Sequence, residues 1–278
     1  MTLVRKTYGK GRVRVMRIHS DGDRREVREL TIKAMVEGDF GGAFTAKDNS
    51  TSVSTDTIKN VVNVVARENL AACKESFCKA VAERLLESYP QLTAATVSGH
   101  ETKWNRLSFG GKEHPHSFVL DGNGEPFAEV SATRDAIKIT SGVKGFTFMK
   151  TTQSGWDNFF KDKYSTIAET RDRMAATSML ASWRWSEAPK DYDATNAEIL
   201  STMLEVFATT YSESVQDSLY RMGGAALAAV PQIIDISMAC PNKHYLLINL
   251  SPFNLDNKNQ VFLPTDEPHG QIECTVGR

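Results

Sequence analysis

Apolar residues recur with two different spacings along the first half of the chain, and each spacing predicts one kind of secondary structure. Residues 11–19 and 26–36 are strand-like, and the second run places an apolar side chain at every second position from residue 30 to residue 36. Residues 56–68 and 75–88 repeat apolar side chains at spacings of three and four, which predicts two amphipathic helices. Strand-like runs then return near 92–107, 116–120 and 126–133.

The second half repeats this order without repeating the sequence. Strands are predicted near 136–150 and 177–186, helices near 193–208 and 215–229, and strands near 233–239 and 244–249. A helix pair between groups of strands indicates an antiparallel sheet with both helices on one face, which is an α+β unit. We therefore expect two tandem domains, residues 1–135 and residues 136–278.

Composition is that of an ordinary globular protein. Of the 278 residues, 41% are hydrophobic, and 33 basic against 34 acidic residues give a net charge of −1. This balance offers no global basic field for nucleic acid or a membrane surface. There is no long apolar segment and no signal-like N-terminus, and the four cysteines (Cys73, Cys78, Cys240 and Cys274) lack metal-ligand spacing. We expect a cytoplasmic protein with reduced thiols.

Thr55 and Asp56 stand where the first strand region gives way to the helix at 56–68. At a helix N-terminus the first backbone N–H groups have no intrahelical partner, and the dipole favours an anion. One interpretation is an N-cap formed by Thr55 or Asp56, which is a structural role only. The other is a ligand contact, and it gains weight from further motifs along the chain.

Six segments, spread in order from residue 8 to the C-terminus, resemble those of the urate oxidase (uricase) family. They are Tyr8-Gly9-Lys10, Thr55-Asp56-Thr57-Ile58-Lys59-Asn60, the run from Lys161-Asp162 through Tyr164-Ser165-Thr166 to Asp172-Arg173, Ser214-Val215-Gln216, Pro241-Asn242-Lys243-His244-Tyr245, and Cys274-Thr275-Val276-Gly277-Arg278. The resemblance implies two tandem tunnelling-fold domains per chain. It also implies a homotetramer that closes β-barrels around a tunnel, with active sites at subunit interfaces. The implied activity is oxidation of urate by O2 to 5-hydroxyisourate and H2O2 without a cofactor.

The resemblance assigns four residues to gripping urate. Arg173 is a cationic fork for the planar anion, Gln216 an amide pincer, and Val215 a backbone N–H contact. Trp156 takes the stacking position, where the family usually has Phe. Each has a plain structural alternative: Arg173 could form a surface ion pair with Asp172 or Glu169, and Gln216 could simply follow the helix-capping pattern of Ser214 and Asp217.

The same resemblance makes Lys10, Thr55 and His244 the proton-handling residues, with Asp56 beside them and Asn242 over the substrate ring. The chemistry is reasonable, because a desolvated lysine can accept a proton from a neighbouring hydroxyl and histidine titrates near neutral pH. The alternatives are a solvated lysine at a strand start, a packed histidine before an apolar run, and an ordinary turn asparagine after Pro241.

Other classes are less well supported. His114-Pro115-His116 lacks a third ligand at motif spacing, so we expect no metal, and no glycine-rich nucleotide loop precedes a helix. A pterin enzyme of the tunnelling fold usually anchors its ring with a glutamate, where this chain has Gln216. A purine-binding module without activity would need neither Lys10 nor His244. The ending Val276-Gly277-Arg278 is not a peroxisomal tripeptide, which favours a cytoplasmic, bacterial protein.

Overall fold

The computed structural model describes residues 1–278, and the chain divides into two compact units, Met1–Gly142 and Val143–Arg278. The division falls inside strand β6 (Ile137–Lys150), a few residues after the boundary expected from the sequence. No helix has the length and apolar character needed to cross a membrane.

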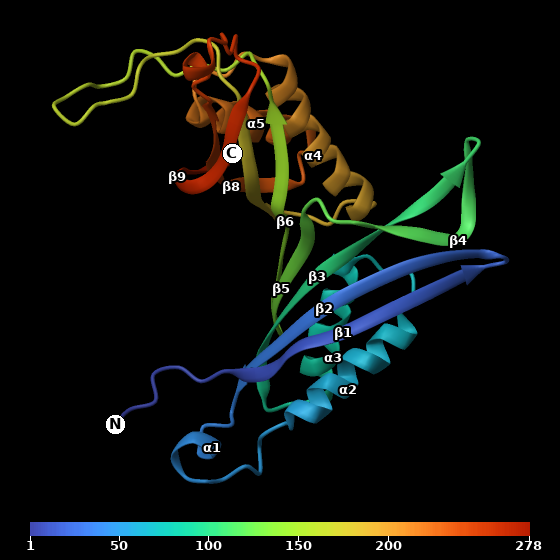
Figure 1. Cartoon of the computed structure of the whole chain (residues 1–278). Coiled ribbons are helices and arrows are strands. Elements are labelled where there is room, and N and C mark those ends of the chain that lie inside the picture. Colours follow the sequence, from blue (N-terminus) through green and yellow to red (C-terminus); the bar gives the residue numbers. More distant parts are fainter. The chain divides into compact units, whose positions relative to one another are not determined.

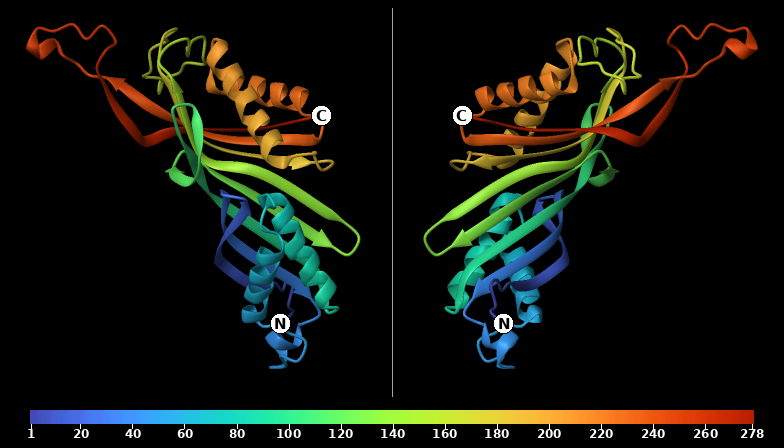
Figure 2. Two further views of the ribbon diagram at one scale, coloured as in Figure 1. Left: turned by 90° about the vertical axis from the view of Figure 1, so that its right-hand side faces the viewer. Right: turned by 90° about the vertical axis from the view of Figure 1, so that its left-hand side faces the viewer.

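Unit 1 is an antiparallel sheet with one helix pair. Its strands are β1 (Tyr8–Asp21), β2 (Arg24–Gly38), β3 (Leu92–Phe109), β4 (Lys112–Asp121) and β5 (Glu125–Thr133). The sheet order is β1-β2-β3-β5, and β4 pairs with the second part of β3. Helices α2 (Thr55–Glu68) and α3 (Lys74–Ser88) cover one face, and the short α1 (Gly42–Thr45) lies in the connection before α2 (Figures 1 and 2).

The core of unit 1 follows from the two predicted periods. On β2, Leu30, Ile32, Ala34 and Val36 are all at most 1% exposed, and on α2 the stripe of Ile58, Val62 and Val65 is equally buried. Burying an aliphatic side chain of this size stabilises the fold by roughly 1.5–3 kcal/mol. The strand period of two and the helix period of 3.6 therefore meet at one interface.

Unit 2 repeats the layout. The last part of β6 leads into β7 (Ala175–Trp185), then α4 (Tyr192–Thr209), α5 (Val215–Ala229), β8 (Ile233–Leu247), the short 3₁₀ helix η1 (Ser251–Phe253) and β9 (Phe262–Gly277). Strands β7, β8 and β9 are antiparallel neighbours in that order, and α5 packs against β8 and β9. The predicted α+β class with helix pairs on one face of an antiparallel sheet is confirmed.

Two strand predictions in unit 2 were wrong in detail. The runs at 233–239 and 244–249 are one continuous strand, β8, which passes through Pro241. Strand β9 was not predicted at all, because Pro264, Pro268 and Gly270 interrupt its apolar alternation. Pairing with β8 over most of its length supplies the order that local propensity does not.

Candidate active site

Three of the predicted site residues, Arg173, Asn242 and His244, line one pocket of unit 2. The pocket holds about 880 Å³ of space including its open mouth. Arg173 approaches it from the segment just before β7, while Asn242 and His244 come from β8. Two segments far apart in sequence thus place a cation, an amide and an imidazole around the same space.

Arg173 is half-buried, and its Nε atom is buried without a hydrogen-bond partner. Its backbone N–H donates to the carbonyl of Ser154 at 2.9 Å, which fixes the start of the side chain. Burial lowers the pKa of the Arg173 guanidinium, which stays cationic at neutral pH. A desolvated cation with an unused donor is arranged to receive an anion.

The two ion pairs considered as alternatives for Arg173 are absent. Asp172 accepts a hydrogen bond from the Thr152 hydroxyl at 2.7 Å, and Glu169 pairs with Lys161 at 2.9 Å. Both carboxylates are exposed and already occupied by other side chains. The surface-pair interpretation of Arg173 is therefore wrong.

Asn242 and His244 are two residues apart on β8, so both side chains leave the same face of the strand. The pairing with β9 shifts register between them: Asn242 lies opposite Gly270 and His244 opposite Thr265. This bulge inserts extra residues of β9 beside the pocket, a device that commonly re-aims side chains near active sites.

The N-terminus of α5 carries Val215 and Gln216 in its first turn. The Ser214 hydroxyl accepts from the Asp217 backbone N–H at 3.0 Å, so the capping pattern expected from the sequence is confirmed. This cap satisfies only the third amide of the helix, and the N–H groups of Val215 and Gln216 have no intrahelical acceptor. Val215 is half-buried and the Gln216 side chain is exposed.

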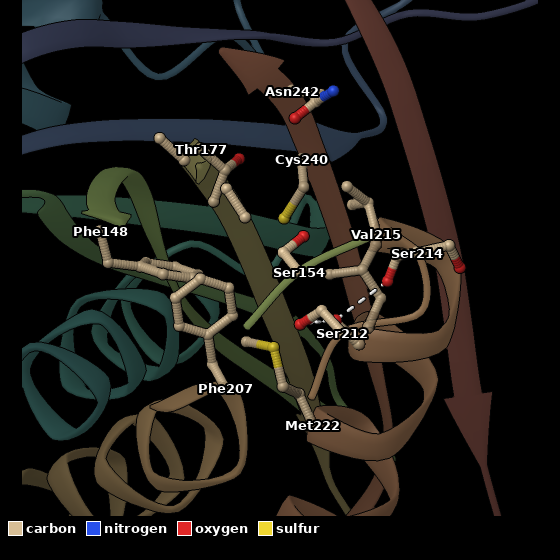
Figure 3. A pocket seen from close by; sticks show the side chains of 14 residues that line it. Phe148, Ser154, Thr177, Phe207, Ser212, Ser214, Val215, Met222, Cys240 and Asn242 are labelled. Atoms are coloured by element: carbon tan, nitrogen blue, oxygen red, sulfur yellow. Dashed lines mark hydrogen bonds between the residues drawn. The ribbon is translucent and has the colours of Figure 1, made fainter. Parts of the chain in front are cut away.

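A second, smaller cavity shares Asn242 with the first pocket and reaches Val215 (Figure 3). Phe148, Phe207 and Met222 form an apolar side of it, and serine hydroxyls lie on another. Burial raises the pKa of Cys240 in its wall to about 11, so this thiol stays protonated and is a poor nucleophile at neutral pH.

Trp156 is held by its backbone rather than by the pocket. Its N–H donates to the Thr170 carbonyl at 2.7 Å, and its carbonyl accepts from the Thr170 N–H at 3.0 Å. The half-buried indole stacks on Phe159, with ring centroids 5.5 Å apart and planes 10° from parallel. Trp156 does not line the pocket of Arg173 in this chain, so its stacking role stays a prediction.

The remaining predicted residues lie in unit 1. Lys10 is on β1 opposite Ala34, and Thr55 and Asp56 are exposed in the first turn of α2. The pKa of Asp56 is lowered, first by its hydrogen bond from Lys59 and to a smaller extent by the charge of Lys10. The proton-handling roles of Lys10 and Thr55 stay a prediction.

The predicted N-cap at Thr55 or Asp56 is wrong, because Ser54 caps α2. The Ser54 hydroxyl accepts from the Thr57 N–H at 3.0 Å and also contacts the Thr57 hydroxyl at 2.7 Å. Asp56 is bonded instead to Lys59 and, at 3.1 Å, to Asn60. With the cap supplied one residue earlier, the Thr55 hydroxyl is not used to close the helix.

His114 and His116 lie edge to face with ring centroids 4.6 Å apart. No group of three or more His, Cys, Asp and Glu side chains that could hold a metal occurs among residues 1–278. Sequence motifs also missed part of the pocket wall, including Asn259 and Phe262. These two residues follow a stretch without periodic apolar residues, and no signal in the sequence would have found them.

A family model for uricase matches residues 6–131 and 139–273 of this chain. The chain belongs to the uricase family. It is 34% identical to a uricase of Arthrobacter globiformis over 100% of its own length and 90% of the relative's, and 36% identical to a uricase of Oryctolagus cuniculus over 99% and 94%. The crystal structure of the Arthrobacter globiformis uricase superimposes with a TM-score of 0.94, covering 100% of this chain and 95% of that one. The expected family and enzyme class are confirmed.

Proposed function

We propose that this urate oxidase binds and oxidises urate in the pocket of Arg173, Asn242 and His244. The observation that carries the assignment is that Arg173 lines the pocket and has a buried Nε donor without a hydrogen-bond partner. Urate is a planar anion with carbonyl oxygens on its rim, and a guanidinium can donate parallel hydrogen bonds to such an edge. A buried donor left unpaired costs free energy, so the pocket favours a ligand that satisfies it.

The other proposed binding groups contact the edge and the face of the urate ring. The free N–H of Val215 and the side-chain amide of Gln216 can pair with amide-like atoms on the opposite rim of urate. Trp156 offers an aromatic plate, for which it must turn from Phe159 towards the bound ring. Asn242, on the wall shared by both cavities, can hold O2 or water over the ring.

Lys10 and Thr55 remove a proton from bound urate, and His244 passes protons onward. The electron-rich dianion then gives O2 one electron, which avoids the spin barrier, and the resulting peroxide at C5 leaves as H2O2. Water adds at C5 and gives 5-hydroxyisourate. The balance is urate plus O2 plus water to 5-hydroxyisourate plus H2O2, and the protein supplies no electrons. This scheme uses no metal and no organic cofactor.

We further propose a homotetramer in which Thr55 and Asp56 of one chain complete the pocket of another. The two sets of site residues belong to different units, and Thr55 and Asp56 are exposed at a helix start with its orphan N–H groups. Such an end is suited to contact a ligand held by a neighbour. The assembly is expected in the cytoplasm.

A mixing experiment tests the shared site. Thr55→Ala and Arg173→Ala proteins are each purified, dissociated together and reassembled, and urate-dependent O2 uptake is measured. Both variants alone should be nearly inactive, and the mixture should recover a fraction of activity, because some interfaces then pair two intact halves. Thr51→Ala and Arg171→Ala, which change exposed side chains of the same types, are the matched controls. No recovery despite demonstrated subunit exchange would exclude the shared site.

Chelation tests the absence of a metal. Activity after dialysis against EDTA should equal that of untreated protein, since no metal-binding cluster is needed by the scheme. A loss that added divalent metal restores would overturn the cofactor-free mechanism while leaving the urate pocket standing.

A further inference from the structure

Three segments that carry the proposed urate-binding groups are tied to one another by backbone hydrogen bonds. The Gly155 N–H donates to the Ser212 carbonyl at 2.9 Å, and the Ser212 N–H donates to the Gln153 carbonyl at 3.0 Å. Residues 153–156 are in turn bonded to residues 170–173 through the pair of Trp156 and Thr170 and through Arg173. We call residues 153–156, 170–173 and 211–212 the clasp.

One side chain, that of Tyr211, reaches across the clasp. Its hydroxyl donates to the carbonyl of Arg171 at 2.8 Å, two residues before Arg173. It also lies over the backbone of Gly155: a Cβ atom built on Gly155 would be 2.3 Å from the tyrosine Oη and 3.3 Å from its Cζ. Only glycine leaves room for the phenol in this position. We call the space above the backbone of Gly155 that the Tyr211 phenol fills the notch.

The Tyr211 hydroxyl holds residues 170–173 on the side where they make few other hydrogen bonds. Residues 161–169, which lead into the clasp, are all exposed, whereas Ser154 and Ser212 on the opposite side are buried. Without the Tyr211 hydroxyl, the backbone of residues 170–173 keeps its bonds to residues 154 and 156, and the side chains of Asp172 and Arg171 keep theirs to Thr152 and Asp157.

We propose that Tyr211 is a positioning residue for urate: through the Arg171 carbonyl and the Gly155 notch it fixes where the Arg173 fork points. The inference rests on the proposed function, because it assumes that Arg173 grips the substrate. It adds a residue outside the pocket wall whose single hydroxyl sets binding rather than chemistry.

Tyr211→Phe is the direct test, with KM and kcat for urate measured by O2 uptake and the Kd of xanthine, a flat purine lacking the C8 oxygen, measured separately. We expect KM and Kd to rise about two- to tenfold, the range that one net hydrogen bond corresponds to, with kcat nearly unchanged. Tyr220→Phe removes a hydroxyl from a tyrosine that is 69% exposed on α5 and should change none of them. An unchanged KM in Tyr211→Phe would overturn the proposal, and so would a drop confined to kcat.

The notch gives a second, independent test. Gly155→Ala should raise KM more than Tyr211→Phe does, because the new methyl group displaces the phenol and residues 170–173 with it. The double variant Gly155→Ala/Tyr211→Phe lacks the tyrosine Oη that would clash with the new methyl group, and only contacts above 3 Å remain. Its KM should therefore be at least about threefold lower than that of Gly155→Ala and approach that of Tyr211→Phe. Additive effects of the two substitutions would contradict the notch.

Arg173→Ala separates this proposal from the assignment of the pocket. If Arg173→Ala raises KM while Tyr211→Phe does not, the pocket stands and the positioning role fails. If wild-type protein oxidises urate and Arg173→Ala leaves KM unchanged, the pocket assignment fails, and the proposal built on it fails too.

Discussion

Unit 1 and unit 2 each contain an arginine whose Nε is buried and unpartnered, yet the surroundings of the two residues differ. Arg17 on β1 is 2% exposed, donates from Nη1 to the Asn69 carbonyl at 2.6 Å, and lies with its Cζ 4.3 Å from the centroid of the Phe77 ring. Arg173 lines an open pocket. Arg17 is enclosed by protein, whereas Arg173 is one of the residues that line a pocket. An unsatisfied buried donor thus points to a ligand only where there is room for one.

The same contrast runs through the polar groups of the two units. In unit 1, the fully buried Glu75 accepts from the Ser141 hydroxyl at 2.6 Å, and the buried Lys74 lies within ion-pair distance of Glu75 and Glu101. In unit 2, the free amides of α5 lie near a cavity. We infer that unit 1 uses buried polar groups for its own stability, whereas the proposed site in unit 2 uses some of them to bind substrate. The following predictions can break or sharpen this division.

The largest effect is expected from Lys10→Met, which tests the one role given to unit 1 in the chemistry. Losing a general base typically costs roughly 10²–10⁴-fold in rate, so kcat should fall by that order while KM changes little. Stopped-flow or O2-uptake kinetics measure both constants. Lys33→Met, on the exposed side of β2, is the control and should behave as wild type. Equal kcat in Lys10→Met and wild type would remove Lys10 from the proton relay.

The two buried arginines give a paired prediction. Arg173→Met should raise KM about tenfold or more, as expected for a lost hydrogen bond to a charged group worth about 1.5–3 kcal/mol, and should leave the Tm unchanged or higher. Arg17→Met should lower the Tm and leave KM unchanged. It leaves the Asn69 carbonyl without its donor, which costs about 1–3 kcal/mol of unfolding free energy. Thermal melts and steady-state kinetics of both variants measure these effects. An equal loss of Tm in the two variants would contradict the proposed difference between the two arginines.

Trp156 tests whether a side chain that stacks within its own segment also serves the ligand. Trp156→Ala should weaken binding of urate and of xanthine by about 1–3 kcal/mol, taking base–aromatic stacking as the guide. Trp156→Phe should retain most of the affinity, since it keeps an aromatic face. Titration of xanthine into each variant gives the Kd values. If both variants bind as wild type does, the ring stacks only on Phe159.

The smallest effect concerns the stability of unit 1 in acid. Glu29 is buried on β2 and accepts from Arg14 at 2.6 Å and from the Trp104 indole at 2.9 Å, and the Arg14 hydrogen bond chiefly lowers its pKa from 4.5. Because the pKa of Glu29 is lower in the folded state, ionised Glu29 stabilises the fold above about pH 4.5. That contribution to stability is lost as the pH falls through the folded-state pKa. Glu29→Gln should therefore lower the Tm at pH 7 and flatten its decline below pH 4.5, compared with the exposed control Glu87→Gln. Parallel pH curves would contradict this.

Much of the fold was predictable because helix and strand periods are local. The stripe of α2 and the Ser214 cap of α5 both follow from spacing over a few residues. Strand β9 was not predictable, because its prolines and glycine break the period and pairing with β8 restores it. Competition between neighbouring hydroxyls likewise decided that Ser54, not Thr55, caps α2.

Sequence motifs could bring three members of the proposed site together, but they could not give its geometry. Motif spacing nominated Arg173, Asn242 and His244, which do share a pocket. The burial of Arg173 Nε and the stacking of Trp156 on Phe159 depend on contacts between distant segments. Such contacts leave no periodic trace in the sequence, and the role we infer for Tyr211 is of the same kind.

The edges of the sheet have a practical consequence for handling the protein. Strands β1 and β9 each pair on one side only within the chain, and their exposed faces include Met16, Ile18 and Leu263, each at least half exposed. An isolated chain would present two long, partly apolar templates for uncontrolled strand addition. Dilution should then cause slow, irreversible loss of activity, and shelf life becomes a matter of rate and protein concentration rather than of equilibrium stability.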